Sequence, residues 1–196
     1  MVTYYAYRDE SGTLLYQKVR LEPKAFRLRR PDGQGGWTYN LDGTRRVLLG
    51  LPELIDVTDI FIVEGEKDVR ALQKLGLSAT TNAGGAGQWR DDYAQQLSCT
   101  GALRVNIIPD NDEPGQTHAA TVARSCHTAG IEARIVRLPD LRPKGDVSDY
   151  LDAGHTPCRS RGTGQGDGRP VTGRHRRART CPAASGIRDL HPHQHR

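Results

Sequence analysis

The 196-residue sequence is poor in aromatic residues, cysteines and long apolar runs, and each shortage excludes a class of protein. No stretch approaches the roughly 18–20 consecutive apolar residues that cross a bilayer, and the N-terminal residues lack the regions of a signal peptide. The four cysteines form no Cys-x-x-Cys pair, which argues against a structural zinc site and against a disulfide scaffold. We therefore expect a cytoplasmic protein with no membrane partner.

The charge is divided unevenly along the chain, although the formal net charge is only +5. Residues 1–50 carry nine basic and five acidic side chains, residues 51–156 carry ten and sixteen, and residues 157–196 carry nine and two. The last stretch alone makes the protein basic, so the overall basicity is poor evidence for nucleic-acid binding. A basic first part beside an acidic second part is better evidence, because a metal-dependent enzyme acting on a polyanion needs both.

Residues 1–55 predict a small, basic antiparallel sheet. Aromatic or alternating stretches at 4–8, 14–21, 25–30 and 37–41 are separated by turn residues, which is typical of hairpins. Basic side chains concentrate near the later strands and have two interpretations, a surface that contacts phosphates or an ordinary solvated sheet face. The candidate nucleic-acid-binding residues are Lys24, Arg27, Arg29 and Arg30.

Residues 56–156 predict an α/β domain with a mostly parallel four-stranded sheet and helices on both faces. The continuous apolar run at 60–63 is typical of a strand that is buried on both faces, and residues 105–108 are expected to form another strand of the same sheet. Stretches with helical spacing of apolar residues end at Gly76 and Gly130. This alternation of strands and helices favours parallel pairing.

Residues 157–196 lack Lys, Glu, Asn, Met and aromatic residues, and are rich in Arg, Gly, Pro and His. Such a segment cannot bury enough apolar surface to offset its ordering entropy, so we predict a disordered tail. The composition is also that of GC-rich DNA translated in a wrong frame, and we interpret the tail as a frameshifted gene end. An Arg-rich arm that binds nucleic acid is the alternative.

Acidic side chains follow three of the four strands predicted in residues 56–156. Because ligands bind beyond the carboxyl ends of the strands in an open parallel sheet, we expect these acids to meet at one edge. Clustered carboxylates repel one another, and Mg²⁺ (or Mn²⁺) is a natural partner because it prefers oxygen ligands. Each acid taken alone also has a structural interpretation as a favourable residue at a helix N-terminus. The acids are Glu64, Asp68, Asp110, Asp112, Asp146 and Asp149.

A glycine-rich loop at residues 82–87 follows the second of these strands. Glycine lets a backbone approach a phosphate, so Gly84, Gly85 and Gly87 are candidates for nucleotide or phosphate binding, with a plain flexible loop as the alternative. The loop lacks the Lys-Ser/Thr pair of a Walker A motif and is therefore no ATPase signature.

Two of these acidic stretches resemble the TOPRIM domain that bacterial-type primases, topoisomerases and some nucleases share. Residues 63–68 read Val-Glu-Gly-Glu-Lys-Asp, and residues 108–115 read Ile-Pro-Asp-Asn-Asp-Glu-Pro-Gly. The family pattern is a Glu after the first strand and an Asp-x-Asp after the third. Three further stretches are similar to the primase or primase–helicase proteins of phages, plasmids and integrated mobile elements: residues 24–29, 48–54 and 144–151.

The resemblance implies metal-dependent nucleotidyl transfer, in which RNA primers are made on single-stranded DNA from nucleoside triphosphates. A replicative helicase is a candidate partner. Glu64, Asp110 and Asp112 would be the catalytic residues, and with Asp68 and Asp146 they would hold the metal. Two alternatives stay open: a TOPRIM nuclease that hydrolyses phosphodiesters with the same metal, and an inactive, truncated primase remnant that only binds nucleic acid.

Overall fold

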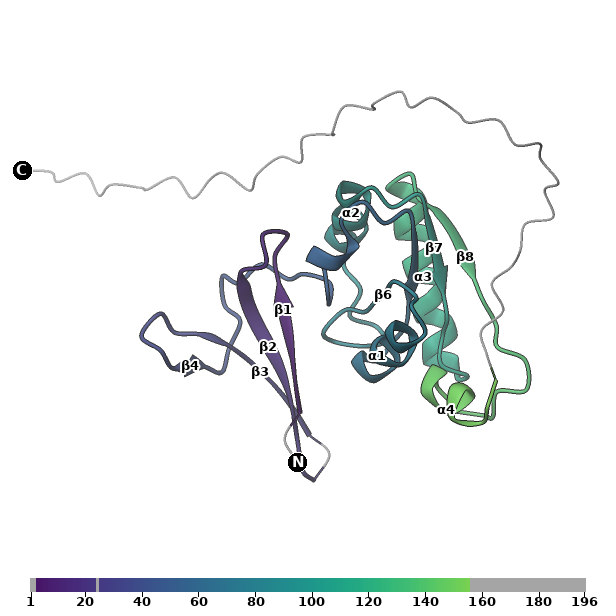
Figure 1. Ribbon diagram of the computed structural model, residues 1–196, viewed down its shortest axis with the longest axis horizontal. Helices are drawn as coiled ribbons and strands as arrows, with labels where there is room; N and C mark the ends of the chain where they lie inside the picture. The colour runs from purple at the N-terminus through teal and green to yellow at the C-terminus, as the bar shows by residue number, and fades with distance from the viewer. Residues whose placement is uncertain (1–2, 24, 156–196) are drawn as a thin grey trace, which may run out of the picture. The chain divides into compact units, whose positions relative to one another are not determined.

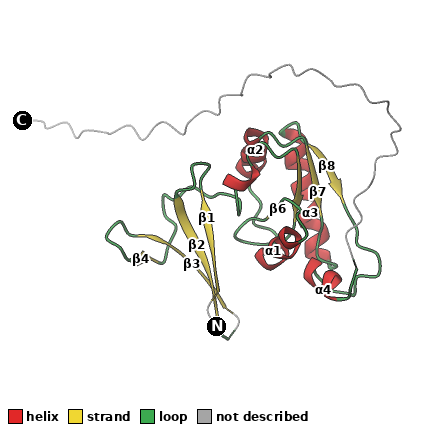
Figure 2. Cartoon of the chain, in the orientation of Figure 1, coloured by secondary structure: helices red, strands yellow, loops and turns green. Residues whose placement is uncertain are grey.

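A computed structural model describes residues 3–23 and 25–155. The predicted tail at 157–196 and the candidate Lys24 lie outside the described residues. The described residues contain two four-stranded sheets, labelled in Figure 1 and drawn as yellow arrows in Figure 2. None of the helices in this part of the chain combines the length and apolar character that crossing a bilayer requires.

The first sheet is antiparallel and has the strand order β1–β2–β3–β4, which confirms the predicted hairpins. Gly12 lies in the turn between β1 and β2 with a φ of 86°, a conformation that glycine adopts without steric cost. The strands are β1 (Thr3–Arg8), β2 (Leu14–Leu21), β3 (Ala25–Pro31) and β4 (Trp37–Thr38).

The second sheet is parallel throughout, in the order β6–β5–β7–β8, and it confirms the predicted α/β class. Its strands are β5 (Asp59–Ile62), β6 (Ala79–Thr80), β7 (Arg104–Ile107) and β8 (Glu132–Ile135). A short 3₁₀ helix, η1 (Pro52–Leu54), precedes β5. The α-helices are α1 (Glu66–Lys74), α2 (Asp91–Thr100), α3 (Glu113–Thr128) and α4 (Val147–Asp152).

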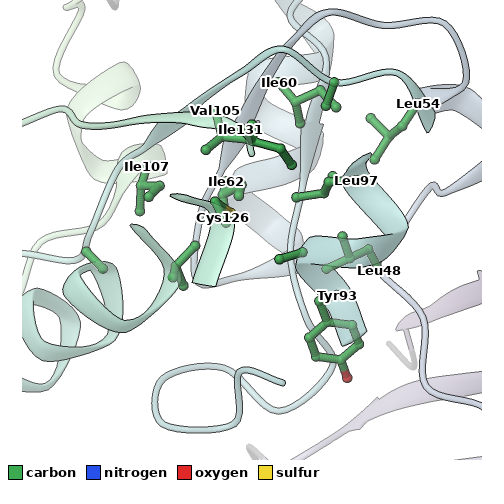
Figure 3. Close-up of a cluster of buried hydrophobic side chains, with 14 residues drawn as sticks. Leu48, Leu54, Ile60, Ile62, Tyr93, Leu97, Val105, Ile107, Cys126 and Ile131 are labelled. Atoms are coloured by element: carbon green, nitrogen blue, oxygen red, sulfur yellow. The ribbon is translucent and has the colours of Figure 1, made fainter. Parts of the chain in front are cut away.

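Helices pack on both faces of the parallel sheet, as the apolar strands predict. On one face, Ile60, Val105 and Ile107 pack with Leu97 of α2 and with α3 side chains that include Cys126 (Figure 3). On the other face, a second cluster joins the ends of β5 and β7 to α1 and α4. Burying each large apolar side chain contributes about 1.5–3 kcal/mol, so the two clusters hold the carboxyl edge of the sheet in place.

A third apolar cluster contains Tyr7 and Tyr16 of the antiparallel sheet together with Val47, Leu51 and Ala83. The two tyrosine rings stack, with their centroids 4.6 Å apart and their planes 10° from parallel. Because Ala83 belongs to the glycine-rich loop after β6, this cluster connects side chains of the basic sheet to a loop at the edge of the parallel sheet.

Candidate active site

Four of the predicted acids meet at the carboxyl edge of the parallel sheet. Glu64, Asp68, Asp110 and Asp146 line one open cavity of about 320 Å³. Glu64 and Asp110 come together because β5 and β7 pair in parallel register, so the residues after both strands emerge at the same edge. Asp112 lines a neighbouring cavity instead, and its charge still acts on Glu64 and Asp110.

Asp110 is the acid with the most unusual electrostatic environment. The backbone N–H of Asp110 donates to Oε1 of Glu64 at 3.2 Å, while its own carboxylate has no hydrogen-bond or ion-pair partner among the described residues. The pKa of Asp110 is raised to about 7. Burial is the largest cause, and repulsion by the charges of nearby acids adds to it: Glu64, Asp68, Asp146 and Asp112. Burial also raises the pKa of Glu64. Because these raised pKa values reflect an environment that disfavours negative charge, a bound cation would stabilise the ionised carboxylates.

Asp68 has a structural role beside any role toward a metal. Its buried Oδ1 accepts hydrogen bonds from the Ser148 N–H at 2.9 Å and from the Ser148 hydroxyl at 2.6 Å. A Cβ at Gly65 would lie 2.6 Å from the other carboxylate oxygen of Asp68, so only glycine fits there without a shift. These contacts tie the first turn of α1 to the first turn of α4.

Asp112 and Asp146 cap helices, as the structural interpretation of single acids predicts. The Gly115 N–H donates to Oδ1 of Asp112 at 2.8 Å, at the start of α3. Asp146 and Asp149 form a reciprocal capping box at the start of α4, and Lys67 pairs with Asp146 at 3.3 Å. An N-cap of this kind contributes about 1 kcal/mol. The metal role of these acids stays a prediction.

The donor set fits a hydrated divalent cation better than a closed metal cage. Within residues 3–23 and 25–155, no group of three or more His, Cys, Asp or Glu side chains is arranged to hold a metal ion. Mg²⁺ keeps several waters and binds proteins through one or two carboxylates together with substrate phosphates. Glu64 and the unpaired Asp110 are hard oxygen donors that meet this requirement.

Gly115 is a functional candidate whose role the sequence alone does not predict. A Cβ at this position would lie 2.5 Å from Oε1 of Glu64 and 2.6 Å from the carbonyl oxygen of Asp110. Gly115 is buried in the first turn of α3, where glycine costs about 0.5–1 kcal/mol relative to alanine. A glycine inside a helix is the one sign in the sequence that this position is special. The structure explains it, because Glu64 and Asp110 approach Gly115 too closely to leave room for a side chain.

The basic sheet contributes side chains to the same cavity. Arg20 and Phe26 are cross-strand partners on β2 and β3, and both line the cavity together with Tyr5. Arg20 thereby brings a positive charge to the acidic edge. This role could not be predicted from the sequence, because the composition of β2 alone does not reveal which face of the strand meets the second sheet.

A buried polar cluster, which we call the Glu66 cluster, joins β1 and β2 to α1. The Tyr7 hydroxyl donates to Oε1 of Glu66 at 2.7 Å, and Lys18 Nζ lies 2.8 Å from Oε1 and 2.9 Å from Oε2. Burial, reinforced by the charge of Glu66, raises the pKa of Tyr7 well above its ordinary value, so the hydroxyl keeps its proton and donates. Since Glu66 lies between Glu64 and Asp68 in the chain, the cluster fixes the segment that carries both acids.

The structure does not bring the predicted basic residues onto one face. Side chains alternate along a strand, so Arg27 and Arg29 share one face of β3 while Arg30 lies on the other with Phe26. Arg29 is also engaged: it donates twice to Gln17 Oε1, at 3.0 and 2.8 Å, and stacks 3.9 Å from the Trp37 ring centroid. Arg27 is exposed, and binding of nucleic acid by these residues stays a prediction.

The three candidate glycines differ in their surroundings. Gly85 lines the acidic cavity, whereas Gly87 lines a second cavity and donates its N–H to Nδ1 of His118 at 3.3 Å. A Cβ at Gly84 would lie 2.4 Å from Cβ of Gln88, so this glycine serves the fold of the loop itself. Of the three, only Gly85 borders the carboxylates, and phosphate binding by the loop stays a prediction.

Comparisons with known proteins agree with this geometry. Residues 61–151 match the family described as Toprim-like. Over 117 residues the chain is 28% identical to a DNA primase of Chlamydia pneumoniae, a match covering 55% of this chain and 20% of that protein. It is 33% identical over 82 residues to the Gene 57 protein of Mycobacterium phage D29, covering 42% of this chain and 49% of that protein.

One sequence match carries a different name. The chain is 29% identical over 110 residues to an N,N'-diacetylchitobiase of Vibrio harveyi, which covers 56% of this chain and 12% of that protein. The chain therefore spans from about an eighth to about half of the length of these three relatives. A match to so small a part of a protein does not transfer the activity of the whole.

Two solved structures share the fold. The primase fragment of the bacteriophage T7 primase-helicase protein has a TM-score of 0.52 at 20% identity, and covers 79% of this chain and 59% of that chain. The structure of the zinc-binding and RNA polymerase domains of the Aquifex aeolicus primase has a TM-score of 0.59 at 21% identity. This match covers 76% of this chain and 36% of that chain. The acidic edge, the match of residues 61–151 to the Toprim-like family and the shared fold together support a TOPRIM-type domain that is similar to part of known primases.

Proposed function

We propose that this protein catalyses metal-dependent nucleotidyl transfer on a single-stranded DNA template, making RNA primers from nucleoside triphosphates. The observation that carries the proposal is the cavity that Glu64 and Asp110 share with Arg20 of the basic sheet. Carboxylates on one wall can hold a divalent cation, and an arginine on the other can contact a phosphate of the template or of the nucleotide. The similarity to primases supports the same reaction.

In the proposed reaction, the 3′-hydroxyl oxygen of the growing primer forms a bond to the α-phosphorus of a nucleoside triphosphate. The bond from that phosphorus to the bridging oxygen breaks, and pyrophosphate leaves. Glu64 takes up the hydroxyl proton, and Asp110 and Asp112 complete the catalytic set. Glu64 and Asp110, with support from Asp68, Asp112 and Asp146, would hold a Mg²⁺ or Mn²⁺, which would neutralise negative charge on the phosphates.

The Glu66 cluster supports this reaction by position alone. It holds the segment from Glu64 to Asp68 against β1 and β2, the strands that bring Tyr5 and Arg20 to the cavity. Catalysis of phosphoryl transfer depends mainly on positioning and on electrostatic stabilisation, so a rigid link between the basic and the acidic side chains is what the reaction requires.

The test is a primer-synthesis assay with purified protein, single-stranded DNA, labelled ribonucleotides and Mg²⁺ or Mn²⁺. Short RNA that disappears in Asp110→Ala supports the proposal. Degradation of the template without synthesis identifies a TOPRIM nuclease instead. Nucleic-acid binding without any turnover identifies an inactive remnant. The proposed role also implies a cytoplasmic location, which cell fractionation can test. It further implies a replicative helicase as partner, which co-purification from cells can test.

A further inference from the structure

A second cavity, of about 480 Å³, lies beside the glycine-rich loop and the first turns of α3. Among its lining residues are Gly87, Trp89, Glu113, Thr117, His118 and Thr121. It is separate from the cavity that holds Glu64 and Asp110, and the reaction described above does not use its side chains.

Two residues that line this cavity each carry a buried ring nitrogen with no hydrogen-bond partner among the described residues. His118 is only 4% exposed, and its Nδ1 accepts the Gly87 N–H, so the ring proton lies on Nε2. Burial lowers the pKa of His118 and keeps the ring neutral. Both Nε2 of His118 and Nε1 of Trp89 are buried without a hydrogen bond to any described residue. Two neighbouring buried N–H donors without acceptors are uncommon in folded proteins.

The chemistry of the cavity favours a neutral heterocycle over an anion. Its surface is more apolar than polar, and the rings of Trp89 and His118 meet edge-on with centroids 6.3 Å apart. The one ionisable acid in its lining, Glu113, is exposed and would repel a phosphate. A nucleobase offers a flat apolar surface, carbonyl or ring-nitrogen acceptors for the two N–H donors, and exocyclic N–H groups for Glu113.

The cavity lies next to the acidic edge. Gly115, in the first turn of α3, makes the close approach to Glu64, and Glu113 and Thr117 on either side of it line the second cavity. In the loop, Gly85 lines the acidic cavity while Gly87 lines this one. One helical turn and one loop therefore border both spaces.

We propose that the second cavity binds the base of the nucleotide substrate, with the Trp89 and His118 N–H groups as its donors. This inference rests on the proposed function, because it assumes a nucleotide substrate. It also changes the role of the glycine-rich loop, since Gly87 would border a base rather than a phosphate. Both donors are shielded from solvent in this structure, so the proposal includes a side-chain rearrangement of Trp89 and His118 that exposes their N–H groups to the base.

The test follows the indole N–H signals of ¹⁵N-labelled full-length protein while adenosine, guanosine, cytidine and uridine are added without metal. The two tryptophans, Trp37 and Trp89, are distinguished with Trp37→Phe. We expect a saturable shift of the Trp89 signal with at least one nucleoside and none of the Trp37 signal. Ribose 5-phosphate, which carries the anion without a base, should cause no shift.

Two variants keep the test decisive. Thr121→Phe fills the cavity from an exposed position and should abolish the shift, and His118→Leu should weaken nucleoside binding at least tenfold. His127→Ala, an exposed change on the same helix, should leave it unaltered. No saturable shift, a response to ribose 5-phosphate alone, or unchanged binding in Thr121→Phe would overturn the inference. Because neither metal nor triphosphate is present, these results do not depend on whether primer synthesis occurs.

Discussion

Replacement of Lys18 by methionine should destabilise the protein far more than loss of an ordinary surface lysine. Lys18 and Glu66 form an ion pair at 2.8 Å, and their side chains are only 13% and 5% exposed. Methionine keeps most of the apolar length of the lysine but leaves the buried carboxylate with the Tyr7 hydroxyl as its remaining partner. Removing one partner of a buried pair costs about 3–5 kcal/mol, and we expect about 3 kcal/mol here because Tyr7 remains.

The assay is urea-induced unfolding followed by circular dichroism, with Lys67→Met as the matched control. Lys67 is the next residue after Glu66, but it pairs with Asp146 at 3.3 Å and its side chain is 50% exposed. An exposed pair of this kind contributes about 0–1 kcal/mol. The reasoning fails if the two variants lose similar amounts of unfolding free energy, or if Lys18→Met stays within about 1 kcal/mol of the wild type.

A double-mutant cycle separates the pair from general loss of packing. Glu66→Gln removes the buried charge, so adding Lys18→Met to it should cost much less than Lys18→Met costs alone. Tyr7→Phe removes one hydrogen bond to the carboxylate and should cost about 2 kcal/mol. Additive effects of the Lys18 and Glu66 changes would show that the two side chains do not act as a pair.

Three further predictions concern the edge of the parallel sheet. Gly115→Ala should displace Glu64 and lower primer synthesis at least tenfold with little loss of helix content, as product gels and circular dichroism would show. Saturation with Mg²⁺ at a hundred times its dissociation constant should stabilise the wild type by about 2.7 kcal/mol and Asp110→Asn by much less, measured by thermal unfolding. His118, whose folded pKa is lowered, favours its neutral form in the fold, so its own contribution to stability should be lost as the pH drops below about 6.5. Asp110, whose folded pKa is raised, acts in the opposite direction over this range, so the His118 contribution is read from the difference between variants. Between about pH 7.5 and about pH 5 the change in urea midpoint should be less unfavourable in His118→Leu than in the wild type.

Most of the fold could be predicted because its strands have clear periodicity. The alternating stretches predict strands with one buried and one exposed face, as in the first sheet. The continuous apolar run around Ile60 predicts a strand that is covered on both faces, as in the second sheet. Gly76, with a φ of 73° just after α1, is a helix-stop signal with a direct conformational reason. The grouping of Glu64 and Asp110 followed from topology, because residues after neighbouring parallel strands emerge together.

The remaining site residues could not be predicted, because their roles depend on contacts between distant segments. Lys18 meets Glu66 across 48 residues of sequence, and no local pattern predicts that pairing. Nor does the sequence show that Arg20 faces the acids while Arg27 lies on the opposite face, since this depends on which face of the antiparallel sheet packs inward. Gly115 carried a local signal, a glycine inside a helix, but its reason was visible only in three dimensions.

The most direct test of the account is the rate of template-dependent RNA synthesis in Asp110→Asn compared with Asp149→Asn. Both changes replace a carboxylate by an amide. The Asp110 carboxylate lines the acidic cavity with no partner in the described part of the chain, whereas Asp149 belongs to the α4 capping box and pairs with Arg142. We predict that Asp110→Asn abolishes Mg²⁺-dependent synthesis while Asp149→Asn retains most of it. Equal rates in the wild type and in Asp110→Asn would contradict the assignment of the active site to this edge of the sheet.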